Sequence, residues 1–167
     1  MAHAQGAVPP PSQAPLPPGW TVINKSDCKV WNPAPQPTAS VTWTGECHKN
    51  VADGRGVLQW RVGGQPTERY EGEMRNGRPH GRGVFTYADG RRYDGSFRAL
   101  QREGKGTLSF PNGTRYEGEW KADKPNGRGT LTVMGGETYS GPWTAGCFAD
   151  GNRKAWLNAT PKECGFE

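Results

Sequence analysis

Residues 70–74 read Tyr-Glu-Gly-Glu-Met, residues 93–97 read Tyr-Asp-Gly-Ser-Phe, and residues 116–120 read Tyr-Glu-Gly-Glu-Trp. The three tyrosines are 23 residues apart, and a further copy begins at Tyr139 after the same interval. A Gly-x-Gly pair and a later glycine recur in step with them. A fixed short period predicts a repeat architecture, in which each unit buries its apolar face against its neighbours.

Within each copy the side chains alternate as they do in a β-strand. Tyr70 and Met74 fall on one face of the first strand, and Glu71 falls on the other. The glycines Gly90 and Gly113, preceded by Asp and Asn, are typical of tight turns. We therefore expect an all-β fold, an elongated antiparallel meander of stacked β-hairpin repeats with a period of about 23 residues.

The pattern resembles the MORN (membrane occupation and recognition nexus) repeat, in which Tyr-x-Gly-x-Trp precedes a His-Gly-x-Gly loop. Residues 80–83, His-Gly-Arg-Gly, match that loop, whereas later copies have Glu103 and Asn126 in place of His80. The resemblance covers about residues 41–143, with copies starting near 43, 70, 93, 116 and 139. It implies a repeat protein of an exported bacterial type that serves as an assembly scaffold, and it also suggests phospholipid binding.

Composition and charge argue against two classes, nucleic-acid-binding proteins and membrane-spanning proteins. The chain is 32% hydrophobic and carries a formal net charge of +5. From residue 70 to residue 138, 12 basic residues are interleaved with 9 acidic ones, which is typical of a mixed solvated face and argues against nucleic-acid binding. No run of 18 or more apolar residues is present, so we expect no transmembrane segment.

Four cysteines flank the regular copies: Cys28, Cys47, Cys147 and Cys164. Three pairings are open, and proximity in sequence favours Cys28–Cys47 and Cys147–Cys164. Two disulfides would indicate an oxidising compartment. A zinc site with His48 is the alternative, but no Cys-x-x-Cys spacing supports it, so we expect no metal.

The chain divides into four segments. Residues 1–18 read as a proline-rich leader, residues 19–40 as an N-terminal cap, residues 41–143 as the repeat array, and residues 144–167 as a C-terminal cap. Residues 2–4, Ala-His-Ala, resemble the end of a cleaved export signal. With the cysteines, they predict an exported protein, either periplasmic or secreted. Trp20 and Trp31 cap the array or, alternatively, form a ligand platform.

Stacking at a constant period places equivalent rings side by side. The rings are the core of the fold, and we also expect part of this aromatic face to contact a partner, centred on Tyr93 and Tyr116. The predicted contact residues are Tyr70, Tyr93, Phe97, Tyr116, Trp120, Tyr139 and Trp143. On the polar face we expect the glutamates to meet Arg82, Lys105 and Arg128 across strands.

No residues are arranged as a catalytic motif. The histidines lie apart from any serine or unpaired cysteine, and Gly-x-Gly recurs without the strand-to-helix context of a phosphate loop. We therefore expect no enzyme activity and no cofactor. The leading function is a protein-binding or scaffolding module, and the alternative is a module for lipid headgroups or glycans on the same aromatic and basic face. A homodimer formed through the sheet edges stays open.

Overall fold

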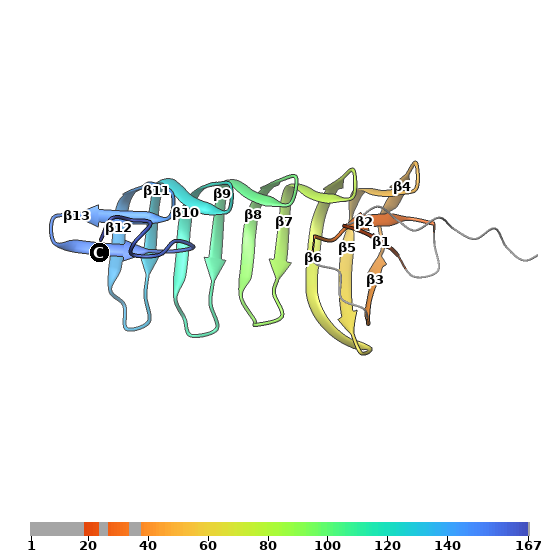
Figure 1. Ribbon diagram of the computed structural model, residues 1–167, viewed down its shortest axis with the longest axis horizontal. Helices are drawn as coiled ribbons and strands as arrows, with labels where there is room; N and C mark the ends of the chain where they lie inside the picture. The colour runs from red at the N-terminus through yellow and green to blue at the C-terminus, as the bar shows by residue number, and fades with distance from the viewer. Residues whose placement is uncertain (1–18, 24–26, 34–37, 167) are drawn as a thin grey trace, which may run out of the picture.

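The computed structural model describes residues 19–23, 27–33 and 38–166, so the predicted leader lies outside the described residues. The described chain contains strands and turns and no helix. Its main sheet has 12 strands, and the repeat strands lie side by side along the long axis of the molecule (Figure 1). The predicted all-β hairpin meander is confirmed.

The strands of the main sheet pair in chain order from β5 to β12. In chain order, the strands are β1 (Trp20–Val22), β2 (Lys29–Trp31), β3 (Ala39–Trp43), β4 (Glu46–His48), β5 (Val51–Val62), β6 (Gln65–Arg75), β7 (Arg78–Thr86), β8 (Arg92–Arg98), β9 (Gln101–Ser109), β10 (Arg115–Lys121), β11 (Lys124–Thr132), β12 (Thr138–Trp143), β13 (Cys147–Asp150) and β14 (Arg153–Trp156). The last two form a separate hairpin. All pairings are antiparallel except a short parallel contact between β2 and β5.

One end of each of the last three repeat hairpins is closed by a turn with glycine in the left-handed region. Gly90, Gly113 and Gly136 have φ angles of 85°, 88° and 91°. In two of these turns a side-chain oxygen accepts the backbone N–H of the residue two positions later: Asp89 Oδ1 accepts from Arg91 at 3.1 Å, and Asn112 Oδ1 accepts from Thr114 at 3.0 Å. The turn chemistry expected from the sequence therefore forms.

The opposite end is closed by two-residue turns in which both central residues have positive φ, the geometry that matches the twist of a hairpin. Leu100 and Asp123 adopt φ angles of 80° and 68°, which are unusual for residues with side chains. Each backbone N–H donates to a carbonyl of the preceding hairpin, from Leu100 to Pro79 at 2.9 Å and from Asp123 to Arg102 at 3.2 Å. These bonds tie successive hairpins together at this end.

One glycine from each repeat strand lies in a single register across the sheet. The row consists of Gly56, Gly72, Gly83, Gly95, Gly106, Gly118, Gly129 and Gly141. A Cβ on Gly95 would lie 2.5 Å from the Cα of Gly106. Only glycine therefore allows this close packing, and the space that the missing side chains leave is occupied by tyrosine rings.

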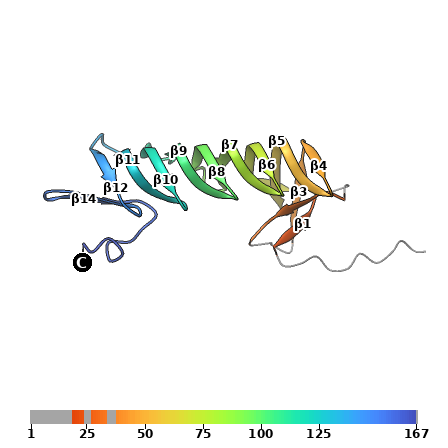
Figure 2. The ribbon, with the colours of Figure 1, turned by 90° about the horizontal axis from the view of Figure 1, so that it is seen from above.

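The two ends are held by the predicted disulfides, Cys28–Cys47 and Cys147–Cys164. The β1–β2 hairpin attaches to the start of β5 and to the β6–β7 turn, since Lys29 pairs with Val51 and the Trp31 N–H donates to the carbonyl of Gly77 at 2.9 Å. Figure 2 shows that this hairpin and the C-terminal segment lie on the same side of the sheet. The aromatic face is thus flanked by a cap at each end.

Candidate functional site

The rings of the aromatic face form one continuous ladder inside the array. Tyr93 contacts Phe97 of its own copy and Trp120 of the next, with ring centroids 5.0 and 5.4 Å apart. Tyr116 repeats the arrangement with Trp120 at 5.1 Å and Trp143 at 5.3 Å. All four contacts are edge-to-face, the geometry that ring quadrupoles favour. The ladder is therefore the contact that joins one repeat to the next.

The tyrosines of this ladder are entirely buried, since Tyr70, Tyr93 and Tyr116 are each 0% exposed. The hydroxyl of Tyr70 donates to the carbonyl of Glu73 at 2.6 Å, and the other two hydroxyls bond three residues ahead in the same way. Burial raises the pKa of Tyr116 to about 12, and it also raises the pKa of Tyr70 and Tyr93, because the phenolate would lose its hydration. These rings stay neutral and act as core.

Six of the seven rings predicted to contact a partner are 0–5% exposed: Tyr70, Tyr93, Phe97, Tyr116, Trp120 and Trp143. The interpretation of the rings as core is confirmed. Tyr139, the seventh, is half-buried, with the guanidinium of Arg153 5.0 Å from its ring centroid. Contact of these seven rings with a partner stays a prediction. The six buried rings offer no free surface in this conformation.

A further apolar row on the same face remains partly uncovered. Tyr87, Phe110 and Val133 follow the 23-residue period, pack against the core and are half-buried. Tyr87 stacks on Phe85 at 4.6 Å. Met134, next to the row, is 71% exposed. The predicted contact residues do not include this row, although its 23-residue period is visible in the sequence. We call Tyr87, Phe110 and Val133 the turn-end row.

An apolar pocket of about 240 Å³ lies between the N-terminal cap and the sheet. Its apolar lining includes Trp31, Trp60, Phe85 and Leu100. Thr67 also lines it, and its hydroxyl is buried without a hydrogen-bond partner among the described residues. A cavity of about 150 Å³ is large enough for benzene. The pocket therefore has room for one large apolar side chain.

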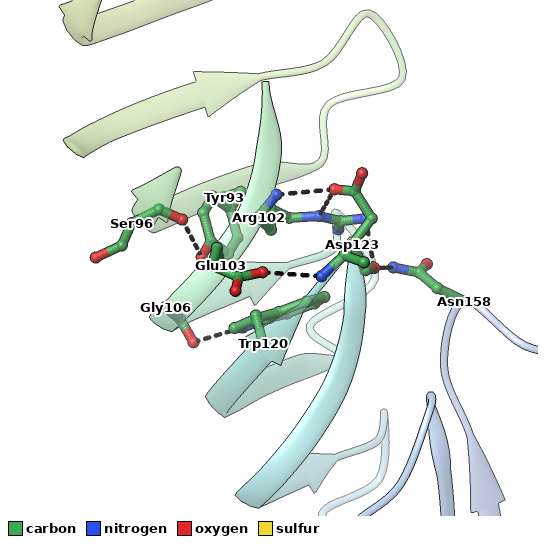
Figure 3. A network of polar contacts seen from close by, with 9 residues as sticks. Tyr93, Ser96, Arg102, Glu103, Gly106, Trp120, Asp123 and Asn158 are labelled. Carbon is green, nitrogen blue, oxygen red and sulfur yellow. Dashed lines mark hydrogen bonds and ion pairs between the residues drawn. The ribbon is translucent and has the colours of Figure 1, made fainter. Parts of the chain in front are cut away.

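A polar network on the array includes Arg102 and Asp123 and reaches Asn158 of the C-terminal cap (Figure 3). Arg102 is 8% exposed, and it occupies a position where the neighbouring copies have proline. Its Nε donates to Asp123 Oδ1 at 2.9 Å, and its guanidinium lies 4.6 Å from the ring centroid of Trp120. Asn158 donates to the backbone carbonyl of Asp123 at 2.9 Å. The network anchors the cap to the array.

On the polar face, three arginines pair with an acid two residues ahead on their own strand. These pairs are Arg69–Glu71 at 2.8 Å, Arg92–Asp94 at 3.1 Å and Arg115–Glu117 at 2.7 Å. The expectation of cross-strand pairs with Arg82, Lys105 and Arg128 is wrong, because these three form no ion pair among the described residues. Residues i and i+2 share a face of a strand, so these three acids form ion pairs with arginines on their own strand.

Within residues 19–23, 27–33 and 38–166, no cluster of three His, Cys, Asp or Glu side chains is arranged to hold a metal ion. All four cysteines are in disulfides. The same residues contain no helix with the length and apolar content of a membrane span. That the protein is not an enzyme stays a prediction.

The comparison with protein families agrees with the geometry of the hairpins. The model of the MORN repeat matches residues 43–65, 70–91, 93–115 and 116–135, more than half of the chain. The chain belongs to the MORN repeat family. A search among curated proteins finds no significant match to this MORN protein. The first matched segment starts at Trp43, which confirms the early copy inferred from the sequence. MORN repeats are generally modules for protein or lipid interactions.

Proposed function

We propose that this MORN protein is a non-enzymatic protein-binding module that contacts its partner through the aromatic face between the two caps. The observation that carries the proposal is the turn-end row, in which Tyr87, Phe110 and Val133 are half-buried at a constant period. A contiguous apolar surface left uncovered on a folded protein is typical of an interaction site. The partner would cover this row and leave the buried ladder undisturbed.

The pocket beside the N-terminal cap supports the same assignment. Protein interfaces are dominated by a few large side chains that fill preformed pockets. The pocket is lined by Trp31, Trp60 and Phe85 on the same face as the turn-end row. The ring of Trp31 is held in place by Trp20, 5.7 Å away, and by the guanidinium of Arg78, 4.5 Å away. A rigid pocket next to an apolar row would give a partner one anchor and one extended contact.

The disulfides support an exported location. Disulfide bonds persist in oxidising compartments and are rare in the cytosol. In this protein they hold both caps, Cys28 to Cys47 and Cys147 to Cys164. We assign the scaffold to the periplasm or to the secreted fraction on this ground.

The test is a capture experiment, in which the full oxidised chain on beads is incubated with an extract of periplasmic and secreted proteins. The variant Tyr87→Ser/Phe110→Ser removes two apolar side chains from the turn-end row. The control Val57→Ser/Val84→Ser removes two half-buried apolar side chains from the opposite face. We expect a specific protein that the first variant loses and the control keeps. Equal retention by both variants, once each is shown to be folded, would reject the turn-end row as the site.

The alternative function, binding of lipid headgroups or glycans, is favoured by the arginines that lie over rings of the aromatic face. Arg91 lies 4.8 Å from the ring centroid of Tyr87, and Arg153 lies 5.0 Å from that of Tyr139. Binding to anionic phospholipid vesicles should weaken steeply as the salt concentration rises, whereas the affinity of an apolar protein contact should change little.

Sedimentation of the purified chain would show whether it also forms a homodimer.

A further inference from the structure

The polar face carries a straight row of cations that the proposed protein contact does not use. Arg82, Lys105 and Arg128 are the middle residues of three Gly-x-Gly pairs, on β7, β9 and β11. All three are exposed, and among the described residues none of them forms an ion pair. We call them the cation row.

The spacing of the cation row follows from the sheet. The glycine next to each cation lies in the common register, and one strand separates each pair of cations. Because neighbouring strands are about 4.8 Å apart, successive cations lie about 9.5 Å apart along the long axis. The equivalent residue of the first copy, Arg55, lies 3.9 Å from Glu73 and is engaged by it.

A shallow groove of about 730 Å³ contains the whole cation row. Hydroxyl groups line it between the cations, from Ser96, Thr107 and Ser109. Two of its three acids, Asp94 and Glu117, form ion pairs with arginines on their own strands. The third, Glu119, accepts the backbone N–H of Arg128 at 2.9 Å and keeps its negative charge, so the five cations of the lining exceed its three acids by two. The groove therefore offers a net positive charge and hydroxyl groups.

We propose that this groove binds a linear acidic polysaccharide with one carboxylate or sulfate in each disaccharide. Such a chain is extended, and its charges recur at about the length of one disaccharide, which is comparable to the spacing of the cation row. Its remaining hydroxyls can exchange hydrogen bonds with Ser96, Thr107 and Ser109. A linear polymer can follow the line of the groove, whereas a bilayer presents its headgroups in a plane.

This site lies on the face opposite the turn-end row, because Arg82 and Phe85 point to opposite sides of β7. It therefore does not depend on the proposed protein contact. A chain with both sites would hold one protein against an anionic polymer, with the sheet as a rigid plate between them.

The experiment measures binding of a hyaluronan decasaccharide to the full oxidised chain by calorimetry, at low salt and at high salt. The variant Arg82→Gln/Lys105→Gln/Arg128→Gln removes the cation row. The matched control is Arg75→Gln/Arg98→Gln/Lys121→Gln, which removes three exposed cations of the same period that lie outside the groove. All variants are first compared with the parent chain by circular dichroism.

We expect the parent chain to bind the decasaccharide and not an uncharged oligomer of N-acetylglucosamine. The cation-row variant should bind at least about tenfold more weakly, and the control should bind nearly as well as the parent, since charge-assisted contacts need specific geometry. Absence of binding by the parent chain would overturn the proposal, and so would an equal loss in the two variants. Binding only to phosphatidylglycerol vesicles, lost in the same variant, would assign the groove to lipid and reject the polysaccharide.

Discussion

Replacing Trp120 by alanine removes the central ring of the ladder. The side chain is 3% exposed, contacts Tyr93 and Tyr116 edge-to-face, and its Nε1 donates to the carbonyl of Gly106 at 3.0 Å. Loss of a buried aromatic ring of this kind costs about 3–5 kcal/mol. Domains are stable by only about 5–15 kcal/mol, so the variant should lose a large part of its free energy of unfolding.

Two further variants give the scale of the effect. Trp120→Phe keeps a ring at a position where the preceding copy has Phe97, so it should lose only about 1–2 kcal/mol, from the hydrogen bond and some volume. Trp156→Ala removes a tryptophan that is 46% exposed and should cost less than about 1 kcal/mol.

The assay is urea unfolding of the four oxidised proteins, followed by far-ultraviolet circular dichroism. Because each repeat contacts only its neighbours, a gap in the centre should also weaken the coupling between the two halves, which would appear as a lower slope or a second transition. A loss below about 1 kcal/mol in Trp120→Ala, or an equal loss in Trp156→Ala, would refute the reasoning that the ladder holds the repeats together.

Three other predictions concern the glycine row, the tyrosine hydroxyls and the caps. Gly106→Ala should lower the melting temperature more than Gly113→Ala, because the first Cβ would meet a buried tyrosine ring, whereas the second meets open space and carries only the strain of positive φ. A smaller effect at Gly106 would contradict this. The raised pKa of Tyr116, about 12 against 10.0 when unfolded, favours folding at neutral pH, and that contribution should be lost as pH rises from about 10 towards 12. Urea unfolding at several pH values should show this decline, and Tyr116→Phe should reduce it; stability that stays constant to pH 11 would count against it. Cys147→Ser/Cys164→Ser should lower the free energy of unfolding by about 2–4 kcal/mol and remove part of the sensitivity to reductant; an unchanged melting curve would show that this bond adds nothing.

Much of the fold could be predicted because the signals are local. The alternation of Tyr70, Gly72 and Met74 assigns each side chain to a face without knowledge of any distant contact. The turn at Gly90 needs only glycine after a residue that bonds its own backbone. The disulfides followed from proximity, since the partners are 19 and 17 residues apart.

Charge pairing on the polar face could not be predicted in the same way. The alternation shows that Glu117 and Arg128 share a face, but it does not show which cation reaches the acid first. In the structure Arg115 forms an ion pair with Glu117 at 2.7 Å, and Arg128 has no ion pair among the described residues. Arg115 lies two residues from Glu117 on the same face of the same strand, and the length and conformation of the side chains decide the pairing, which a periodic sequence does not reveal.

The sequence by itself determined the repeats, the hairpins, the faces of the sheet and the disulfides at its ends, because each depends on neighbouring residues or on a constant period. Only the tertiary structure decided which apolar residues remain uncovered. Tyr116 and Phe110 look alike as aromatic residues on one face, yet the first is fully buried and the second is half-buried. Burial depends on atoms supplied by other segments, as at Tyr116, whose ring packs against Trp143, 27 positions later in the chain.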